Sequence, residues 1–303
     1  MPTDMSADLA IYERRESEAR SYCRDFDTVF TKATGSEMTD EAGTTYIDFL
    51  AGCSSLNYGH NDPDMKKALI AHIEREGLSL EWIIETHVHA DHLTGAPYVK
   101  ECLGGKTGIG ANVDKVQETF KKIFNAEDAF ATDGSQFDHL FQDGEEFKIG
   151  NLTARVMFTP GHTPACATYV IGNAAFIGDT MFSPDFGTAR CDFPNGDAHQ
   201  LYASIQKILA LPDDTIIYLC HDYMPGGRDV MMHTTVAEQK AQNIHLKDCA
   251  DADAFAEMRN TRDAQLSMPA LIIPSVQVNM RGGAMPPPEG NGVSYLKTPI
   301  DVL

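Results

Sequence analysis

The residues best suited to chemistry are four metal-binding side chains in a short stretch of the chain: His87, His89, Asp91 and His92. They follow an apolar run that is typical of a strand. Because side chains alternate along an extended chain, His87 and His89 point to the same side, and two imidazoles can reach one metal ion. Asp91 and His92 lie just beyond, where the chain can turn into a helix over 93–102 and direct a second pair of ligands to the same region.

Three further candidates follow other expected strands: His162, Asp179 and His221. Each stands directly after an apolar or alternating segment, at the strand's carboxyl end. Open α/β sheets place their sites there, because loops from several strands converge on a rigid base. Together the seven side chains supply four or five nitrogen ligands and two carboxylates. This donor set is typical of a site for one or two first-row metals.

The elements that must position these residues follow from the pattern of apolar residues, which predicts an α/β protein from about Leu78 onward. The run 80–86 reads as a strand buried on both faces. Asn112 can cap a helix that continues to about Phe124. The remaining expected elements are strands over 106–110, 152–158, 167–171, 174–177 and 215–220, with a tight turn at 172–173, and a helix over 198–211.

The first 75 residues have a different pattern. Two segments, 28–31 and 45–49, could pair as strands across 35–43. Asp62 and Pro63 form a good helix start, and Gly77 is placed to end that helix.

Composition excludes several classes of function. The 303 residues carry 44 Asp and Glu against 24 Lys and Arg, a formal net charge of -20. Such a field repels nucleic acid and anionic membranes, so we expect neither as a partner. It fits either ordinary solvated carboxylates or a protein from a salty cytoplasm. No apolar run is long enough to span a bilayer and no signal peptide is visible, which predicts a cytoplasmic protein. The seven cysteines form no CxxC pair and read as buried, reduced thiols.

The motifs resemble those of the metallo-β-lactamase superfamily: HVHADH at 87–92, then GHT at 161–163, GD at 178–179 and a late histidine at 221. From about residue 78 to 303 the chain is similar to the persulfide dioxygenase group, which includes β-lactamase hydrolase-like proteins. The segments that carry this closer likeness are 85–92, 131–135, 159–166, 189–193, 220–223 and 278–282. The resemblance implies an αββα sandwich with a metal at one edge of two packed sheets.

The amino-terminal segment resembles another family. Residues 30–33, 46–52 and 56–60 are similar to the start of a class III aminotransferase that acts on diaminobutyrate. This piece lacks the phosphate-binding region and the Schiff-base lysine of that fold. We therefore expect an atypical segment over 1–75, a catalytic domain over 76–303, and a first sheet that is incomplete or replaced.

The resemblance implies one Fe(II) per chain held by His87, His162 and Asp179, with zinc as the alternative metal. His89, Asp91, His92 and His221 would orient these ligands or hold a second metal. The implied reaction converts glutathione persulfide, O₂ and water to sulfite and glutathione. Arg190 is the first candidate for binding a glutathione carboxylate, because a guanidinium can grip it with two hydrogen bonds. Further candidates for substrate binding are Tyr223, Arg228 and Arg281.

Two other functions remain open at this stage. A glyoxalase-II-like thioesterase would use the same ligands for two metals and a bridging hydroxide. An inactive fusion product would fold only in its carboxyl-terminal part. A homodimer is compatible with the sequence.

Overall fold

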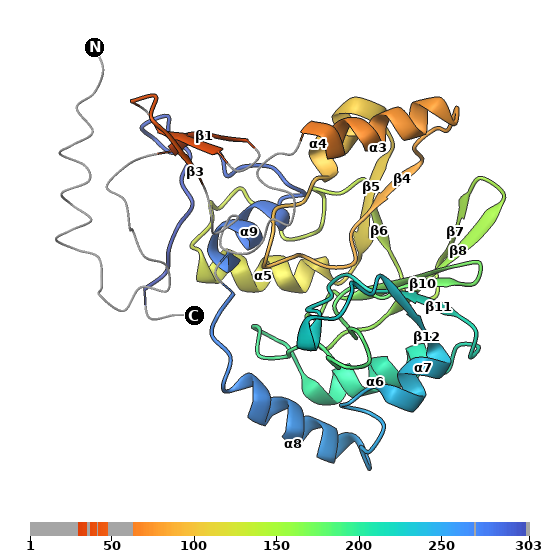
Figure 1. The fold of residues 1–303 in the computed structure, drawn as a ribbon. Helices are drawn as coiled ribbons and strands as arrows, with labels where there is room; N and C mark the ends of the chain where they lie inside the picture. The colour runs from red at the N-terminus through yellow and green to blue at the C-terminus, as the bar shows by residue number, and fades with distance from the viewer. Residues whose placement is uncertain (1–29, 35–36, 41, 48–62, 270, 301–303) are drawn as a thin grey trace. The chain divides into compact units, whose positions relative to one another are not determined.

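The computed structural model describes residues 30–34, 37–40, 42–47, 63–269 and 271–300, and divides the chain into two compact units, residues 1–78 and 79–303 (Figure 1). The first unit contains an antiparallel sheet of β1 (Phe30–Thr34), β2 (Glu37–Asp40) and β3 (Thr45–Ile47), in that order, and the helix α3 (Pro63–Arg75). None of the described helices is long and apolar enough to cross a membrane.

The second unit begins with a small parallel sheet. Its order is β4 (Trp82–Ile84), β5 (Lys106–Gly110) and β6 (His139–Phe141). The connections between these parallel strands carry α4 (Ala96–Leu103) and α5 (Val113–Ile123). None of the strands β1 to β3 pairs with this sheet, so in the described part of the chain it has three strands.

A larger mixed sheet follows, in the order β12-β11-β10-β9-β8-β7. Its strands in chain order are β7 (Glu146–Ile149), β8 (Leu152–Phe158), β9 (Ala167–Ile171), β10 (Ala174–Phe176), β11 (Ile216–Tyr218) and β12 (His233–Thr235). The helix α6 (Ala198–Leu209) connects β10 to β11, which are parallel. The chain ends with α7 (Val236–Gln242), α8 (Ala252–Asp263) and α9 (Ile272–Asn279), and the short 3₁₀ turn η1 (Pro225–Gly227) precedes β12.

Three apolar cores hold the layers together. Phe141, Val156 and Tyr169 pack between the two sheets, with Trp82 and Ile84 against them. A second core joins the larger sheet to α6, α7 and α8, which lie on the same side of it (Figure 1). The third joins β5 to α5 and α9. Helices thus cover the outer face of each sheet, and the predicted αββα order is confirmed.

Several local predictions hold and others are wrong. The pair 167–171 and 174–177 forms the hairpin β9–β10, and α3 begins at Pro63. The pairing of the first two predicted strands is wrong, because the intervening segment holds β2, which separates β1 from β3. Residues 28–29 and 48–49 lie outside the described part of the chain.

Two predictions about burial and one about a helix cap also differ from the structure. The strand β4 is half-buried rather than buried on both faces, because it lies at an edge of its sheet. Asn112 occupies the capping position of α5 but makes no side-chain cap bond. Of the free cysteines, Cys102 and Cys220 are exposed, contrary to expectation, whereas Cys166 and Cys191 are buried. Cys23 and Cys53 lie outside the described residues.

Candidate metal centre

His87 lies three residues beyond the end of β4 in a fixed orientation. The Thr86 carbonyl accepts a hydrogen bond from the Ala167 amide at 2.9 Å, which ties this loop to β9. The Thr86 hydroxyl lies 3.0 Å from Nδ1 of His87, whose side chain is 1% exposed. Nε2 of His87 is buried and has no hydrogen-bond partner in the described part of the protein. The local structure therefore engages one ring nitrogen and leaves the other available to a metal.

His162 follows β8 in a loop that only a glycine permits. Gly161 has φ +141°, and a Cβ atom there would lie 2.3 Å from the Cα atom of Leu201. Nδ1 of His162 lies 2.8 Å from the carbonyl oxygen of Arg190, so Nδ1 donates and Nε2 keeps its lone pair. Buried Cys166 shapes the same loop, because the Thr163 amide donates to its sulfur at 3.3 Å. This arrangement selects the tautomer that can bind a metal.

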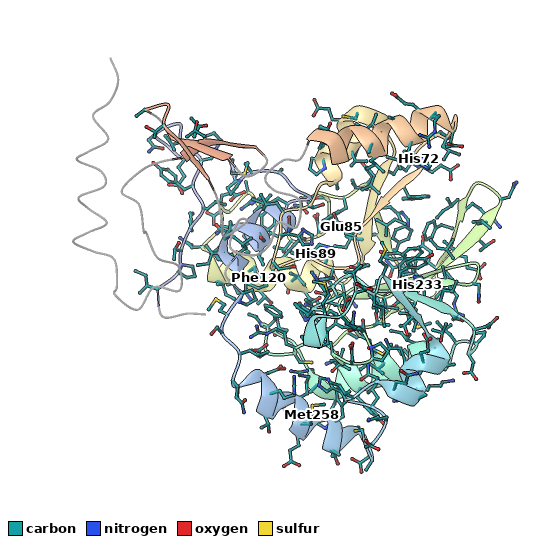
Figure 2. The ribbon with its side chains drawn as sticks, in the orientation of Figure 1. His72, Glu85, His89, Phe120, His233 and Met258 are labelled. Atoms are coloured by element: carbon teal, nitrogen blue, oxygen red, sulfur yellow. The ribbon has the colours of Figure 1, made fainter. Side chains whose placement is uncertain are left out.

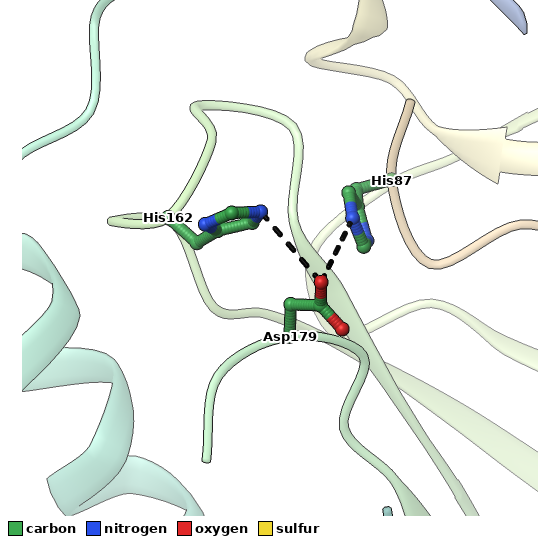
Figure 3. A group of neighbouring side chains, drawn as sticks. All are labelled: His87, His162 and Asp179. Carbon is green, nitrogen blue, oxygen red and sulfur yellow. Dashed lines mark ion pairs between the residues drawn. The ribbon is translucent and has the colours of Figure 1, made fainter. Parts of the chain in front are cut away.

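Asp179 brings the imidazoles together. Its Oδ2 atom lies 3.7 Å from Nε2 of His87 and 3.8 Å from Nε2 of His162 (Figure 3). The same oxygen lies 3.5 Å from Nε2 of His221. The ligand atoms of His87, His162 and Asp179 all lie within 4.8 Å of one another. Oδ1 of Asp179 is buried without a hydrogen-bond partner among the described residues. Unsatisfied buried polar atoms are rare, and a cation bound between the three side chains would satisfy these.

The protonation states suit a cation. Burial lowers the pKa of His87 well below its usual value, and the neighbouring His89 lowers it further. Burial alone would raise the pKa of Asp179, but the hydrogen bond from His221 and the nearby imidazoles outweigh it and hold the pKa far below its usual range. At neutral pH the centre therefore offers neutral imidazole and ionised carboxylate, the forms that bind metals.

A second group of candidate ligands lies beside the first. Ligand atoms of His89, Asp91 and His92 also lie within 4.8 Å of one another. Nε2 of His89 lies 3.3 Å from the carboxylate of Glu85, and Figure 2 labels both residues. Nδ1 of His89 is buried without a hydrogen-bond partner in the described residues. Nε2 of His221 lies 3.3 Å from Asp91 and so connects the two groups.

A cavity of about 560 Å³ adjoins the centre. His162, Asp179 and His221 line it at the metal centre. An aromatic wall consists of Phe182, Phe186 and Tyr223, in which Phe186 and Tyr223 stack with ring centres 4.2 Å apart. This wall gives a substrate an apolar surface next to the ligands.

The predicted substrate-binding residues fall into two groups. Arg190 and Tyr223 line the cavity, although Arg190 already holds Asp192 with two hydrogen bonds of 2.6 Å. Arg228 and Arg281 do not line it. Arg228 pairs with two aspartates, and Arg281 pairs with Glu127 and lies over the Phe130 ring. The geometry does not support a substrate-binding role for these two arginines.

Sequence reasoning missed one part of the cavity wall, which α8 and the segments near it supply: His245, Arg259, Arg262, Gln265, Leu266 and Pro269. None of them belongs to a motif. The only local signal is the spacing of Arg259 and Arg262, which places them on one face of a helix.

Comparisons with known proteins agree with this geometry. A family model described as the metallo-beta-lactamase superfamily matches residues 59–221. The chain is 53% identical over 245 residues to a probable metallo-hydrolase from Burkholderia pseudomallei, a match that covers 78% of this chain and 83% of that protein. It is 53% identical over 257 residues to glyoxylase B2 from Dictyostelium discoideum, which covers 82% and 88%. A beta-lactamase hydrolase-like protein from Agrobacterium fabrum is 55% identical, and the match covers 78% of this chain and 54% of that protein.

Persulfide dioxygenases are more distant relatives. The mitochondrial persulfide dioxygenase ETHE1 of Homo sapiens is 31% identical over 218 residues, 71% of this chain and 74% of that protein. The crystal structure of ETHE1 from Myxococcus xanthus superposes with a TM-score of 0.58 at 27% identity, covering 73% of this chain and 85% of that one. Separately, 72 residues are 58% identical to a diaminobutyrate–2-oxoglutarate transaminase from Halalkalibacterium halodurans, which is 24% of this chain and 17% of that protein.

Proposed function

The chain belongs to the metallo-β-lactamase superfamily, and from this premise we propose that it is a persulfide dioxygenase with one Fe(II) per chain. The reaction combines glutathione persulfide, O₂ and water to give sulfite and glutathione. One observation carries the proposal: His87, His162 and Asp179 form a compact, buried set with unpartnered ligand atoms beside a cavity. Similarity to the human and Myxococcus xanthus ETHE1 proteins supports it.

The donor set fits ferrous iron. Two imidazoles and one carboxylate on one side of a metal are the ligands of many non-haem iron oxygenases. Fe(II) held there would leave coordination positions open for a sulfur anion and O₂. The protein's own contribution is to hold the two imidazole rings in place, through Thr86 at His87 and the Arg190 carbonyl at His162.

The cavity provides for the rest of the substrate. Phe182, Phe186 and Tyr223 offer an apolar wall that limits the access of water. His221 stands between Asp179 and Asp91, where it can orient both carboxylates. The hydrogen bond to Asp179 raises the pKa of His221, and the charge of Asp91 acts in the same direction.

Oxygen consumption tests the proposal directly. The full chain is loaded with Fe(II) without O₂, and O₂ uptake and sulfite are then measured with glutathione persulfide. We expect one sulfite for each O₂ consumed and about one iron per chain. Absence of O₂ uptake from iron-loaded, folded protein would overturn the proposal.

A specific observation favours a second candidate, a glyoxalase-II-like thioesterase. His89, Asp91 and His92 form another group of ligand atoms, and Nδ1 of His89 is buried without a partner in the described residues. Two relatives at 53% identity are named a probable metallo-hydrolase and glyoxylase B2. This enzyme would hold two metals and hydrolyse a glutathione thioester without O₂. Metal content and O₂ uptake therefore separate the two candidates.

We also propose, as expected from the sequence, that residues 76–303 form the catalytic domain and that residues 1–75 form an atypical segment. The short transaminase match supports this view of the first 75 residues. A truncated chain that starts near residue 76 and retains metal and activity would support it.

A further inference from the structure

The cavity next to the metal centre has a second polar group, made of His245, Arg259 and Arg262. The charges of the two arginines act on the pKa of His245, whereas the imidazoles of the metal centre act on the pKa of Asp179. The wall therefore carries two chemically distinct sets of side chains. One set suits a metal and a sulfur donor, and the other is cationic.

His245 presents a neutral donor. Its Nδ1 atom accepts a hydrogen bond from the Thr188 amide at 3.0 Å, so the ring hydrogen lies on Nε2. Nε2 is buried and has no partner in the described part of the chain. Burial lowers the pKa of His245 to about 4, and the charges of Arg259 and Arg262 act in the same direction. At neutral pH the buried N–H group lacks an acceptor, an unfavourable state for a polar atom.

The position of His245 depends on a glycine. Gly187 has φ +107°, and a Cβ atom there would lie 2.2 Å from Nδ1 of His245. Asn243 adds a further tie, because its amide nitrogen donates to the Gly187 carbonyl at 3.1 Å. Thr188 thus binds the ring directly, and Asn243 ties the neighbouring backbone to Gly187.

Arg259 and Arg262 differ in how their charges are compensated. Arg259 is buried and pairs with Asp263 at 2.6 Å, and it also donates to the Thr188 carbonyl. Arg262 lies three residues further on the same helix face. It is exposed, lines the cavity and forms no ion pair with any described residue. Like charges at this spacing repel each other. One positive charge in this wall therefore remains without a counter-charge, in a chain whose formal net charge is -20.

We propose that His245 and Arg262 form a carboxylate-binding subsite that takes the anionic end of the substrate's sulfur carrier. A carboxylate accepts hydrogen bonds and donates none when ionised, so it matches a neutral N–H group and a guanidinium that line the same cavity. One uncompensated positive charge balances a single carboxylate rather than a doubly charged phosphate. The identity of the carrier as glutathione rests on the proposed function, whereas the preference for a carboxylate rests on these residues.

Binding of an unreactive ligand tests the subsite. S-methylglutathione keeps both carboxylates of glutathione but cannot be oxidised as a persulfide, and its diethyl ester removes both charges. Calorimetry on the metal-loaded full chain should show that the ester binds at least about 10-fold more weakly than the diacid. Arg262→Gln should weaken binding of the diacid about 10-fold and leave the ester unchanged. Arg262→Lys, which keeps the charge, should recover part of the loss.

A matched control is Arg155→Gln, because Arg155 is an exposed arginine on β8 that does not line the cavity. It should bind the diacid as the unsubstituted chain does. Equal binding of diacid and ester, unchanged binding in Arg262→Gln, or no binding of the diacid at all would each overturn the subsite.

The turnover experiment separates this inference from the proposed function. With glutathione persulfide, Arg262→Gln should raise KM about 10-fold and leave kcat within about two-fold of the original. If the chain consumes no O₂ but still distinguishes diacid from ester through Arg262, the dioxygenase proposal falls and the subsite stands. If O₂ uptake is normal and Arg262→Gln changes neither KM nor binding, the subsite falls alone.

Discussion

The side-chain amide of Asn279 donates a hydrogen bond to the backbone carbonyl oxygen of His89 at 2.9 Å, across 190 residues of sequence. The same nitrogen donates to the His92 carbonyl at 2.7 Å, and the side-chain oxygen of Asn279 accepts from the Thr94 amide at 2.9 Å. One buried side chain at the end of α9 therefore satisfies three backbone groups of the loop that carries the candidate ligands.

Asn279→Ala should lower metal affinity although Asn279 touches no candidate ligand atom. Loss of the three bonds frees the loop and leaves buried backbone groups unsatisfied, which should reduce the free energy of unfolding by about 3 kcal/mol. Loss of a contact that orients metal ligands typically weakens metal binding, so metal affinity should fall about 10- to 100-fold. A competitive chelator titration measures it.

The control for this variant lies on the same helix. Gln277 makes three comparable hydrogen bonds, but to Ile273 and Lys297 rather than to the ligand loop. Gln277→Ala should lose similar stability and keep its metal affinity. Equal loss of affinity in both variants would contradict the role of Asn279.

His162→Ala and His221→Ala should separate the two candidate enzymes. The dioxygenase reading predicts that His162→Ala abolishes both iron binding and O₂ uptake. His221→Ala should keep about one iron per chain and lose about 10- to 100-fold in activity, because His221 only orients the carboxylates. Elemental analysis and an oxygen electrode measure both. Two metals in the original chain, with one metal and all activity lost in His221→Ala, would instead favour the thioesterase.

Gly161→Ala should destabilise the protein far more than Gly172→Ala. Both glycines have positive φ, but a Cβ atom at Gly172 would meet nothing within 4 Å, whereas one at Gly161 would lie 2.3 Å from the backbone of Leu201. We expect a loss of about 1 kcal/mol for Gly172→Ala and about 3 kcal/mol for Gly161→Ala. Urea unfolding gives both values. Similar losses would show that the backbone of α6 at Leu201 shifts easily to accept the added methyl group.

Stability should depend on pH through His245. Its pKa is about 4 in the folded chain, below the ordinary 6.5, so the unfolded chain binds the proton first as pH falls. The contribution of His245 to the free energy of unfolding is fully present above about pH 6.5 and is lost progressively as pH falls toward about 4. His245→Gln should flatten that part of the curve when unfolding free energies are compared from pH 4 to 7. An unchanged slope would mean that other groups cause the dependence.

Salt should raise the melting temperature. A formal charge of -20 repels itself, and ions screen that repulsion within about 8 to 10 Å at physiological strength. Thermal melts from low to molar salt measure the effect. A flat response would remove the electrostatic argument for adaptation to salty surroundings.

The candidate metal ligands could be located from the sequence because each stands beside a local pattern that marks a strand end. His87 and His89 alternate in extended chain, and His162 and Asp179 each follow a recognisable strand. The strands β6, β7 and β12 are short, and the sequence analysis did not predict them. The substrate end of the cavity was missed for another reason: His245 acquires its role from Thr188, 57 residues away, and a sequence alone does not show that contact.

The buried cysteine in the His162 loop has a chemical consequence if the site handles persulfides as proposed. Burial raises the pKa of Cys166 to about 12, although hydrogen bonds with Thr163 oppose the shift. At pH 7 only about one molecule in 10⁵ carries the thiolate, which is the form that attacks sulfur–sulfur bonds. Cys166 therefore remains inert toward persulfides, and the loop that presents His162 is protected from modification by the substrate that the site is proposed to consume.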